Sequence, residues 1–533
     1  MAEVYPEDLE QGVADRRVGV WGLPDLDNDR RALKGLMDVK SVLKREPAML
    51  VGGSWIETRE TRPVINPADE STVAEVPEGD ASHAEASLEA ARKAQRSWAR
   101  RSGVERGAAL AAVADGIRGR REDLARLVVT EQGKTITEAR DEIAGAAGFF
   151  DYYASFARAQ VGSMFVPDEA GEHLFIKSVP YGVVAAITPW NFPAAIFSRK
   201  VAPAIMAGNA IVLKPHENTP LAALALAGII EEAGVPQGIV NVVTGAGAVV
   251  GEALVRHPLT QMVTVTGSVR AGREILAAAA ENITPVSLEL GGKAPFIVLE
   301  DADLDAAVKN AVNARFWNCG QVCTCNERTY VHRDLYDAFV DRFVARAGSL
   351  RMGDPMHEDV QMGPKVSEPE LIKVESMVGD AVRQGASVVL GGRRPEGGEF
   401  EKGYWFEPTV LTGATNDIDI VQSEVFGPVL PIQAFDDFGE VVDMANDSPY
   451  GLTAYVFTRD LSRAMRAIDD IDFGEIYVNK IGPEQLQGFH TGYRLSGMGG
   501  DDGEYGYERY LRRKTVYLGY DPSTVDEAPS NLG

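Results

Sequence analysis

The sequence predicts an α/β protein built around Rossmann-like parallel sheets. Short apolar runs alternate with helical stretches of roughly ten or more residues, and two such series follow each other along the chain. Alternation of this kind indicates parallel βαβ units, because parallel strands need a long crossover connection. A chain of 533 residues is also too long for a single ordinary core, so more than one domain is expected.

The first series lies between residues 182 and 290. Its expected strands are 182–187, 210–213, 239–243, 262–265 and 285–290. Helices are expected after Pro193 and over 221–233, which predicts a nucleotide-binding sheet covered by helices on both faces. The preceding residues 48–150 are mostly helical in pattern, with apolar residues such as Leu88 and Trp98 on one face, and should pack on this sheet.

The second series follows Gly291-Gly292. Its expected strands are 296–299, 328–331, 388–390, 429–432 and 475–478. Two further segments, 162–179 and 514–520, read as strands without partners in either series, so they pair with each other or with another subunit. The domain boundaries that follow are an N-terminal extension at 1–47, a nucleotide-binding domain at 48–161 and 181–290, a bridging element at 162–180 and 505–533, and a catalytic domain at 291–504. Leu33, Leu36, Met37 and Leu43 predict a short helix before Pro47.

Composition narrows the functional classes. The formal net charge is −25, which argues against a nucleic-acid partner. No apolar run reaches the roughly 18 residues of a membrane span, and the N-terminus lacks the basic flank of a signal peptide, so a cytoplasmic protein is expected. An anionic cofactor would have to find local cations or helix N-termini in such an acidic chain.

The three cysteines, Cys319, Cys323 and Cys325, fall in one short stretch. Their spacing fits neither a disulfide framework nor a zinc site, and no metal is expected. Cys323 follows Gly320 in a polar segment ahead of an expected helix, where a thiol can point into a cleft and act as a nucleophile. Such a nucleophile needs an oxyanion donor worth about 3–4 kcal/mol, and Asn191, at the end of a predicted strand, supplies an amide. Taken singly, each residue is as well explained by a buried cysteine or an ordinary turn asparagine.

Motifs in a fixed order make the combination specific. They are T-P-W-N-F-P at 188–193, K-P-H-E at 214–217, T-G-S at 266–268, L-E-L-G-G-K at 288–293, G-Q-V-C at 320–323 and E-V-F-G-P at 424–428. In these motifs the chain resembles the NAD(P)-dependent aldehyde dehydrogenase superfamily, from about Met49 to Tyr520. The resemblance implies that Cys323 is the nucleophile, that Asn191 and the Cys323 backbone N–H bind the oxyanion, and that Glu289 is the general base. Because members that transfer the acyl group to coenzyme A lack this carboxylate, water is implied as the acceptor.

The same resemblance implies NAD as cofactor. The residues that it assigns to the cofactor are Thr188, Trp190, Lys214, Glu217, Gly245, Gly267, Ser268, Glu424 and Phe426. Lys214 and Glu217 would contact the adenosine ribose, and the Glu217 carboxylate would repel a 2′-phosphate, which favours NAD over NADP. His216 departs from the small residue usual there and would weaken this preference if it faced the phosphate.

The C-terminal run from Gln487 to Gly503 most resembles the lactaldehyde/glycolaldehyde dehydrogenase branch. Arg199, Trp317, Glu484 and His490 are therefore expected to contact a short hydroxy-aldehyde. Alternatives remain: Arg199 can pair with a helix neighbour, or bind the carboxylate of a semialdehyde, and the chain can be a catalytically silent binding protein or a cofactor-independent thiol esterase. Cys325 can also form a strained disulfide with Cys323 under oxidation. A homo-oligomer, dimer or tetramer, is expected from the unpaired strands.

Overall fold

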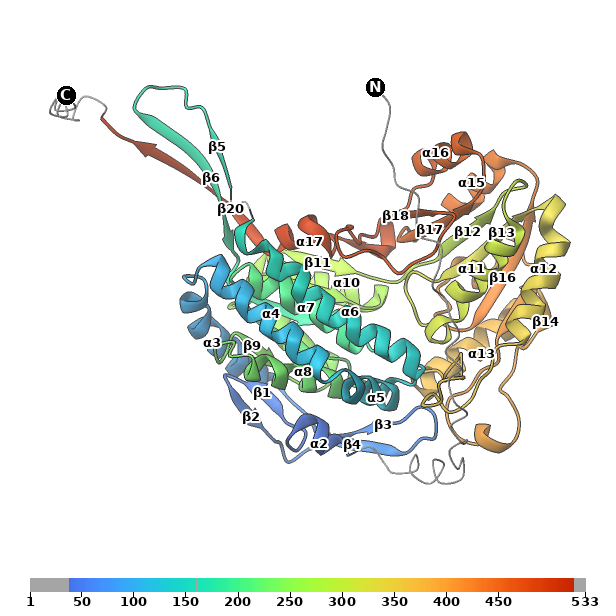
Figure 1. Cartoon of the computed structure of the whole chain (residues 1–533), viewed down its shortest axis with the longest axis horizontal. Coiled ribbons are helices and arrows are strands. Elements are labelled where there is room, and N and C mark those ends of the chain that lie inside the picture. Colours follow the sequence, from blue (N-terminus) through green and yellow to red (C-terminus); the bar gives the residue numbers. More distant parts are fainter. Residues whose placement is uncertain (1–37, 160–161, 522–533) are drawn as a thin grey trace, which may run out of the picture. The chain divides into compact units, whose positions relative to one another are not determined.

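The computed structural model describes residues 38–159 and 162–521 (Figure 1). Most of the N-terminal extension, including Leu33, Leu36 and Met37, and the last twelve residues of the expected bridging element, 522–533, lie outside the described residues. What the structure describes of the helix expected before Pro47 is α2, Val39–Leu43.

The first sheet has eight strands in the order β19-β11-β10-β7-β8-β9-β1-β2. Its centre consists of β7 (Val183–Ile187), β8 (Ala210–Lys214), β9 (Val240–Val242), β10 (Met262–Thr266) and β11 (Val286–Glu289). These are the five strands that the sequence predicts, and all four pairings between them are parallel. The antiparallel edges were not predicted: β1 (Met49–Val51) and β2 (Ser54–Ile56) lie at one side and β19 (Gly497–Met498) at the other.

Helices α4, α6 and α7 lie side by side over this sheet (Figure 1). The helices of this half of the chain are α3 (Ala81–Trp98), α4 (Gly103–Gly119), α5 (Arg121–Gln132), α6 (Ile136–Ala154), α7 (Pro193–Met206), α8 (Leu221–Glu232), α9 (Glu252–Arg256) and α10 (Val269–Ala279). Capping boxes at Asp80, Ser102 and Thr135 begin α3, α4 and α6, which satisfies N–H groups that a helix start leaves unpaired. Within the segment 48–150, which was predicted to be mostly helical, the helices begin at Ala81. The residues before Ala81 form β1, β2 and the hairpin of β3 (Thr61–Ile65) and β4 (Thr72–Pro77).

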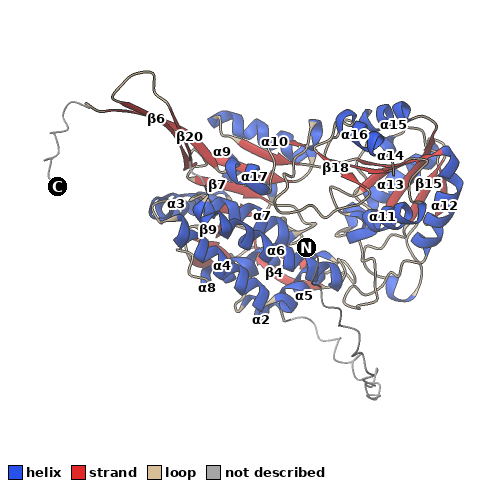
Figure 2. Cartoon of the chain, turned by 45° about the horizontal axis from the view of Figure 1, so that its top comes forward, coloured by secondary structure: helices blue, strands red, loops and turns tan. Residues whose placement is uncertain are grey.

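The second sheet has seven strands in the order β14-β15-β16-β13-β12-β17-β18. They are β12 (Ala294–Val298), β13 (Asn326–His332), β14 (Ser387–Leu390), β15 (Thr409–Thr412), β16 (Val429–Phe435), β17 (Thr453–Phe457) and β18 (Glu475–Val478). Its helices are α11 (Leu304–Phe316), α12 (Arg333–Gly348), α13 (Glu368–Arg383), α14 (Asp419–Gln422), α15 (Phe438–Asn446) and α16 (Leu461–Asp470). Strands β15 and β17 were not predicted. Figure 2 shows the strands of this sheet between helices.

The two segments predicted as unpaired strands do pair with each other. β20 (Leu511–Gly519) runs antiparallel to β6 (Glu172–Pro180), and β6 also pairs with β5 (Gly162–Phe165). We call this three-stranded sheet the arm. It extends away from the first sheet, and α17 (Gly503–Arg509) precedes its last strand (Figures 1 and 2).

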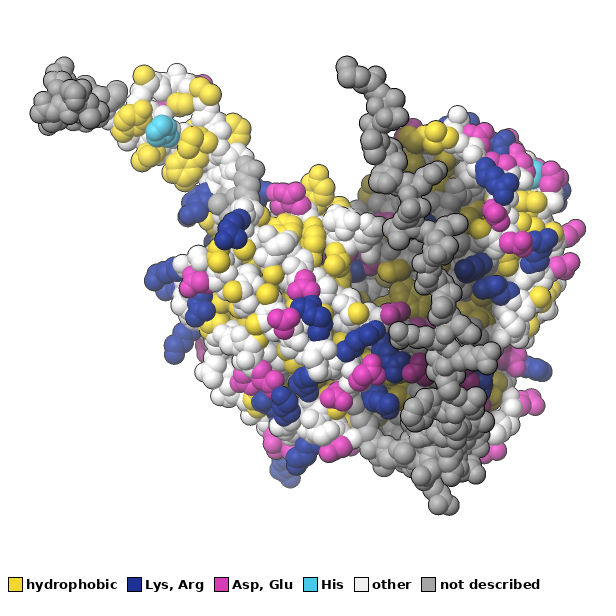
Figure 3. Space-filling model, viewed as in Figure 1, with side chains coloured by type: hydrophobic (Ala, Val, Ile, Leu, Met, Phe, Trp, Pro, Cys, Tyr) yellow, Lys and Arg dark blue, Asp and Glu magenta, His cyan; other side chains and the backbone are white. Residues whose placement is uncertain are grey.

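The arm differs from the rest of the visible surface in its side chains. Figure 3 shows apolar side chains gathered on the arm, whereas basic and acidic side chains are interspersed over the body below it. Met164 and Tyr517 are 73% and 76% exposed. Among the described residues no helix is both long and apolar enough to cross a membrane.

Candidate active site

The loop that carries Cys323 has an unusual backbone. Asn318, Cys319 and Gly320 all have positive φ, at 49°, 56° and 70°. A Cβ on Gly320 would lie 2.4 Å from the Gly427 carbonyl oxygen, so only glycine fits there. The helix expected after Cys323 is wrong: a turn closes from Cys325 N–H to the Val322 carbonyl at 3.1 Å, and the chain then enters β13. The reversal places Cys323, a partly exposed residue, within this turn between α11 and β13.

Buried side chains hold this loop in its strained conformation. Arg315 donates to the carbonyl oxygens of Gly320 and Asn326 at 2.9 and 2.7 Å, and Gln321 Nε2 donates to the Asn318 carbonyl at 3.0 Å. The Asn318 backbone N–H donates to Glu138 at 2.7 Å. Left-handed conformations at non-glycine residues cost about 1–2 kcal/mol each, and these hydrogen bonds offset that cost.

Asn191 lies between β7 and α7 and faces the same loop. Its side-chain Nδ2 donates to the Gln321 carbonyl at 3.0 Å, two residues before Cys323. Its own carbonyl accepts hydrogen bonds from Lys134 Nζ at 2.9 Å and from Asn318 Nδ2 at 3.0 Å. The predicted amide therefore lies beside the nucleophile loop. Sequence reasoning missed Lys134 and Asn318, because isolated polar residues in buried segments carry no periodic signal.

Glu289 ends β11 and is 2% exposed. Neither carboxylate oxygen has a hydrogen-bond partner among the residues that the structure describes. Burial raises the pKa of Glu289 to about 8, although His490, at 3.7 Å, opposes this shift. Buried Leu288 and Leu290 flank it in the sequence. A carboxylate with two unused acceptors and a raised pKa is suited to accept a proton from water.

His490 follows β18 and lies between the candidate nucleophile and the candidate base. It is 3% exposed, and it acts to lower the pKa of the Cys323 thiol. Its Nδ1 lies 3.0 Å from Glu475 Oε1, and its Nε2 lies 3.7 Å from Glu289 Oε2. Burial is the largest influence on the His490 pKa and lowers it, but Glu475, Cys323 and Glu289 together raise it well above its usual range.

Arg199 is paired with carboxylates from distant segments. It forms ion pairs with Glu484 and, at 3.0 Å, with Asp502. The alternative that Arg199 pairs with a helix neighbour is therefore wrong. Burial raises the pKa of Asp502 to about 7 despite the nearby guanidinium. The next residue on α7, Lys200, pairs with Asp501 at 2.6 Å.

Trp317 supplies an aromatic wall to the nucleophile loop. Its ring packs against Phe192, with ring centroids 5.4 Å apart. Phe192 directly follows Asn191, so this contact joins the two segments that carry the candidate nucleophile and the candidate oxyanion donor. This position beside both segments is compatible with the expected contact between Trp317 and the substrate.

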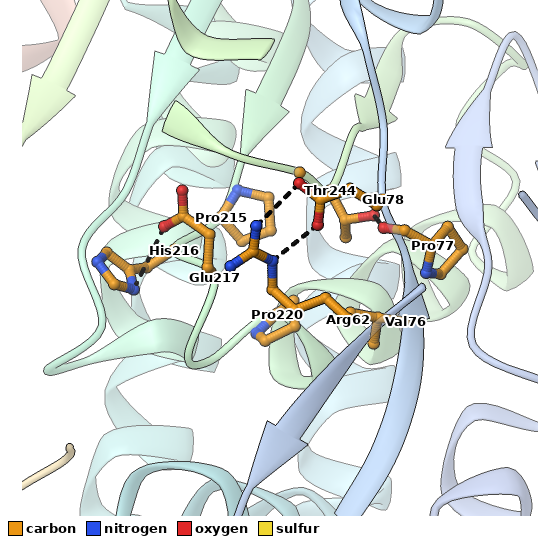
Figure 4. A pocket seen from close by; sticks show the side chains of 10 residues that line it. Arg62, Val76, Pro77, Glu78, Pro215, His216, Glu217, Pro220 and Thr244 are labelled. Atoms are coloured by element: carbon orange, nitrogen blue, oxygen red, sulfur yellow. Dashed lines mark hydrogen bonds and ion pairs between the residues drawn. The ribbon is translucent and has the colours of Figure 1, made fainter. Parts of the chain in front are cut away.

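A small cavity lies at the ends of β8 and β9 (Figure 4). Its polar lining includes Arg62, Glu78, His216, Glu217 and Thr244. Arg62 and Glu78 form a two-bond ion pair at 2.7 and 3.0 Å. Burial lowers the pKa of His216 to about 4, which leaves this imidazole neutral at neutral pH.

Glu217 and its neighbours suit a ribose. Lys214 lies 3.1 Å from Glu217, and the Gly247 backbone N–H donates to the same carboxylate at 2.6 Å. Burial acts to raise the pKa of Glu217, but Lys214 and His216 lower it to about 2. Gly245 has φ of 132°, and a Cβ there would lie 2.7 Å from the Gly79 carbonyl. A charged donor and a charged acceptor beside this cavity fit the hydroxyls of a nucleotide.

The other expected cofactor residues lie at the ends of neighbouring parallel strands, where α/β sheets bind ligands. Thr188, Lys214, Gly245 and Gly267 follow or end β7, β8, β9 and β10. Ser268 is the N-cap of α10, as predicted for a helix start that receives a phosphate.

Glu424 and Phe426 lie on the loop before β16. Trp190 and Phe426 meet edge to face, with centroids 5.3 Å apart, and Glu424 accepts a hydrogen bond from Gly292 N–H at 2.8 Å. Glu327, which no motif singled out, accepts from the backbone N–H groups of Val425 and Phe426 at 2.8 and 2.9 Å. This buried carboxylate, paired with Lys293, fixes the loop that carries both residues.

The remaining thiols face the interior. Cys319 and Cys325 are buried, and all three cysteines are free. The Cys325 thiol donates to the Val322 carbonyl at 2.9 Å. A disulfide between Cys325 and Cys323 stays an untested alternative.

Comparisons with known proteins agree with this geometry. The model of the aldehyde dehydrogenase family matches residues 55–516. A 3,6-anhydro-alpha-L-galactose dehydrogenase of Streptomyces coelicolor is 57% identical, over 91% of this chain and 98% of its own. The lactaldehyde dehydrogenase of Escherichia coli is 44% identical, over 88% and 96%. The expected lactaldehyde branch is thus among the relatives, but a relative named for an anhydrosugar is more similar.

A solved structure gives the same result for the fold. The structure of a 3,6-anhydro-L-galactose dehydrogenase in complex with NAP is 48% identical and superposes with a TM-score of 0.88, covering 89% of this chain and 100% of its own. The family model and these relatives span most of the chain, and they show that it belongs to the aldehyde dehydrogenase family, as an NAD(P)-dependent aldehyde dehydrogenase.

Proposed function

We propose that the chain oxidises a 2-hydroxyaldehyde to the corresponding carboxylate, with Cys323 as nucleophile and water as acyl acceptor. One observation carries the proposal: Cys323, a partly exposed residue on a strained loop, lies near His490, which is 3.7 Å from a buried carboxylate with no hydrogen-bond partner among the described residues. A thiol and a base in this arrangement suit acyl transfer through a thioester.

The residues divide the reaction between them. The Cys323 sulfur attacks the aldehyde carbon, and the resulting oxyanion would be bound by Asn191 Nδ2 and the Cys323 backbone N–H. A nicotinamide cofactor, when bound, supplies the hydride acceptor. Glu289 then takes a proton from the water that hydrolyses the Cys323 thioester, and the free acid leaves.

The substrate class follows from the polar groups around the thiol. Arg199, Glu484 and His490 offer donors and acceptors for hydroxyl groups beside Cys323. Lactaldehyde and open-chain 3,6-anhydrogalactose, after which two relatives are named, both carry a hydroxyl on the carbon next to the aldehyde. A 2-hydroxyaldehyde is what these names share. The size of the rest of the substrate, from lactaldehyde or glycolaldehyde to an anhydrosugar, is what the test must decide.

A semialdehyde is the weaker candidate. It needs a cation that is free to bind the distal carboxylate, whereas Arg199 already pairs with Glu484 and Asp502. A third carboxylate beside this cluster would be repelled by the two that are present.

We propose NAD as the preferred cofactor. Glu217 and Glu78 line the cavity proposed for the adenosine ribose, and their negative charges disfavour a 2′-phosphate. A solved relative nevertheless carries NAP, so both dinucleotides belong in the assay. We further propose a cytoplasmic homo-oligomer, dimer or tetramer, formed through the exposed apolar side chains of the arm, with no nucleic-acid or membrane partner.

The experiment follows NADH or NADPH formation with lactaldehyde, glycolaldehyde, 3,6-anhydrogalactose, succinate semialdehyde and an unsubstituted aliphatic aldehyde, and Cys323→Ala is the blank. We expect the 2-hydroxyaldehydes to have the highest kcat/KM. Preference for the semialdehyde would overturn the substrate class but keep the mechanism. No reduced cofactor with any aldehyde, from protein that binds NAD, would favour a silent binding protein. Ester hydrolysis alone, without cofactor, would favour a thiol esterase.

A further inference from the structure

We propose that Glu475 and His490 form, with Cys323, a relay that generates the nucleophilic thiolate before any cofactor or aldehyde binds. The proposal rests on the nucleophilic role of Cys323 given above and adds a catalytic residue, His490, and a positioning residue, Glu475. In this reading His490 acts first on the sulfur, and its contact with substrate is secondary.

The geometry orders the three groups in a row. On one side His490 lies near Cys323 and lowers the pKa of its thiol, and on the other its Nδ1 lies 3.0 Å from Glu475 Oε1. The imidazole is also fixed by its backbone, since His490 N–H donates to the Asp501 carbonyl at 3.0 Å and its carbonyl accepts from Asp501 N–H at 2.8 Å. Thr453 Oγ1 donates to the second Glu475 oxygen at 3.0 Å, and this bond fixes the orientation of the Glu475 carboxylate. A nucleophile, a base and an orienting acid in this order are suited to activate a thiol.

The proton transfer is internal and balanced. The S–H bond of Cys323 breaks, an N–H bond forms on the imidazole of His490, and the electron pair stays on sulfur. The products are a thiolate and an imidazolium, and the Glu475 carboxylate neutralises the imidazolium from its far side. No oxidant, metal or second substrate is needed.

The surrounding charges favour this transfer. The carboxyls near His490 include Glu475, Glu289, Glu484, Asp502 and Asp501. Two cations pair with members of this group: Arg199 with Glu484 and Asp502, and Lys200 with Asp501. Burial raises the pKa of the Cys323 thiol, and among the neighbouring groups His490 opposes this shift most strongly. Without His490, burial would still raise the pKa of the thiol, and the interaction that most lowers this pKa would be lost.

The test measures alkylation of Cys323 by iodoacetamide against pH, without aldehyde or dinucleotide, and mass spectrometry identifies the modified residue. We expect His490→Asn to raise the apparent pKa of alkylation by about one unit or more, which slows the reaction about tenfold at neutral pH. Glu475→Gln should shift it in the same direction by less. His357→Asn, at an exposed histidine, is the matched control and should leave the profile unchanged.

The outcomes distinguish the proposed relay from a purely structural role of His490. An unchanged alkylation profile in His490→Asn, in protein with a wild-type circular dichroism spectrum, would overturn the relay. If His490→Asn unfolds, the Glu475→Gln profile decides, because a histidine that only packs would not make thiol ionisation depend on that carboxylate. A His490-dependent profile in an enzyme that oxidises no tested aldehyde would leave the relay standing and refute the proposed function alone.

Discussion

The side-chain amide of Asn318 donates a hydrogen bond to the backbone carbonyl of Asn191 at 3.0 Å, and both residues are buried. This bond joins the loop that carries Cys323 to the turn that carries the proposed oxyanion donor. Asn318 also accepts from Gln132 Nε2 at 3.0 Å and has φ of 49°, a conformation that asparagine tolerates better than most residues. One residue therefore supplies both a backbone shape and a link between the two halves of the site.

Replacing Asn318 separates these two contributions. Asn318→Gly keeps the left-handed backbone but removes the side-chain link. We expect kcat to fall about tenfold or more, because Asn191 and Cys323 are then no longer held in position relative to each other. Asn318→Ala removes the link and also forces alanine into a left-handed conformation, which should cost about 1 kcal/mol more in stability. Steady-state kinetics and thermal unfolding measure the two effects. Equal kcat in wild type and Asn318→Gly would show that the link does not position the site.

The raised pKa of Glu289 predicts a pH dependence. The carboxyl is largely protonated at neutral pH and ionises as the pH passes about 8, and only the ionised form can accept a proton from water. Under conditions where thioester hydrolysis limits turnover, kcat should rise with pH below about 8 and level off above it. A stopped-flow assay with saturating aldehyde and dinucleotide measures this profile.

Glu289→Gln is the companion variant. It keeps the shape of the side chain but cannot accept a proton, so we expect one equivalent of reduced cofactor in a rapid burst and a steady rate lower by about 10²–10⁴. Mass spectrometry should find the acyl group on Cys323. Full steady-state turnover in Glu289→Gln would instead assign the base to another carboxyl, and Asp501, which acts to raise the pKa of Glu289, is the alternative to test.

The sequence predicted the strands that carry the site better than the buried side chains that hold the site in place. The five strands from β7 to β11 were predicted because each is a short apolar run between helices, and the motifs lie at their ends. The pairing of Arg199 with Asp502 and the supporting roles of Lys134 and Glu327 were not predicted. These contacts join residues far apart in the chain, and nothing local in the sequence signals which buried charge meets which.

Cofactor preference should change at Glu217. Glu217→Ser removes a carboxylate from the proposed ribose cavity, where a charge pair at about 4 Å costs up to roughly 4 kcal/mol before solvent screening. We expect KM for NADP to fall at least tenfold and KM for NAD to rise, because the ribose hydroxyls lose an acceptor. Glu252→Ser, at a half-exposed carboxylate of α9, is the control and should alter neither value. An unchanged ratio of the two KM values would mean that Arg62 and Glu78, and not Glu217, determine the choice between NAD and NADP.

The arm should determine the oligomeric state. In the part of the chain that the structure describes, β5 and β20 are the outer strands of the arm, and Met164, Tyr517 and Leu518 are 73%, 76% and 49% exposed. Apolar side chains on an open sheet edge are stable when a second copy covers them, and aspartate there would place charge in that interface. We expect Tyr517→Asp combined with Met164→Asp to lower the mass measured by light scattering to that of a smaller assembly, whereas Ile372→Asp, at a 50% exposed position on α13, should leave it unchanged. The same mass in the arm variant and the wild type would mean that another surface holds the copies together. A wild-type mass of one chain would mean that the arm has no partner of its own kind, and its apolar face would then need a different explanation.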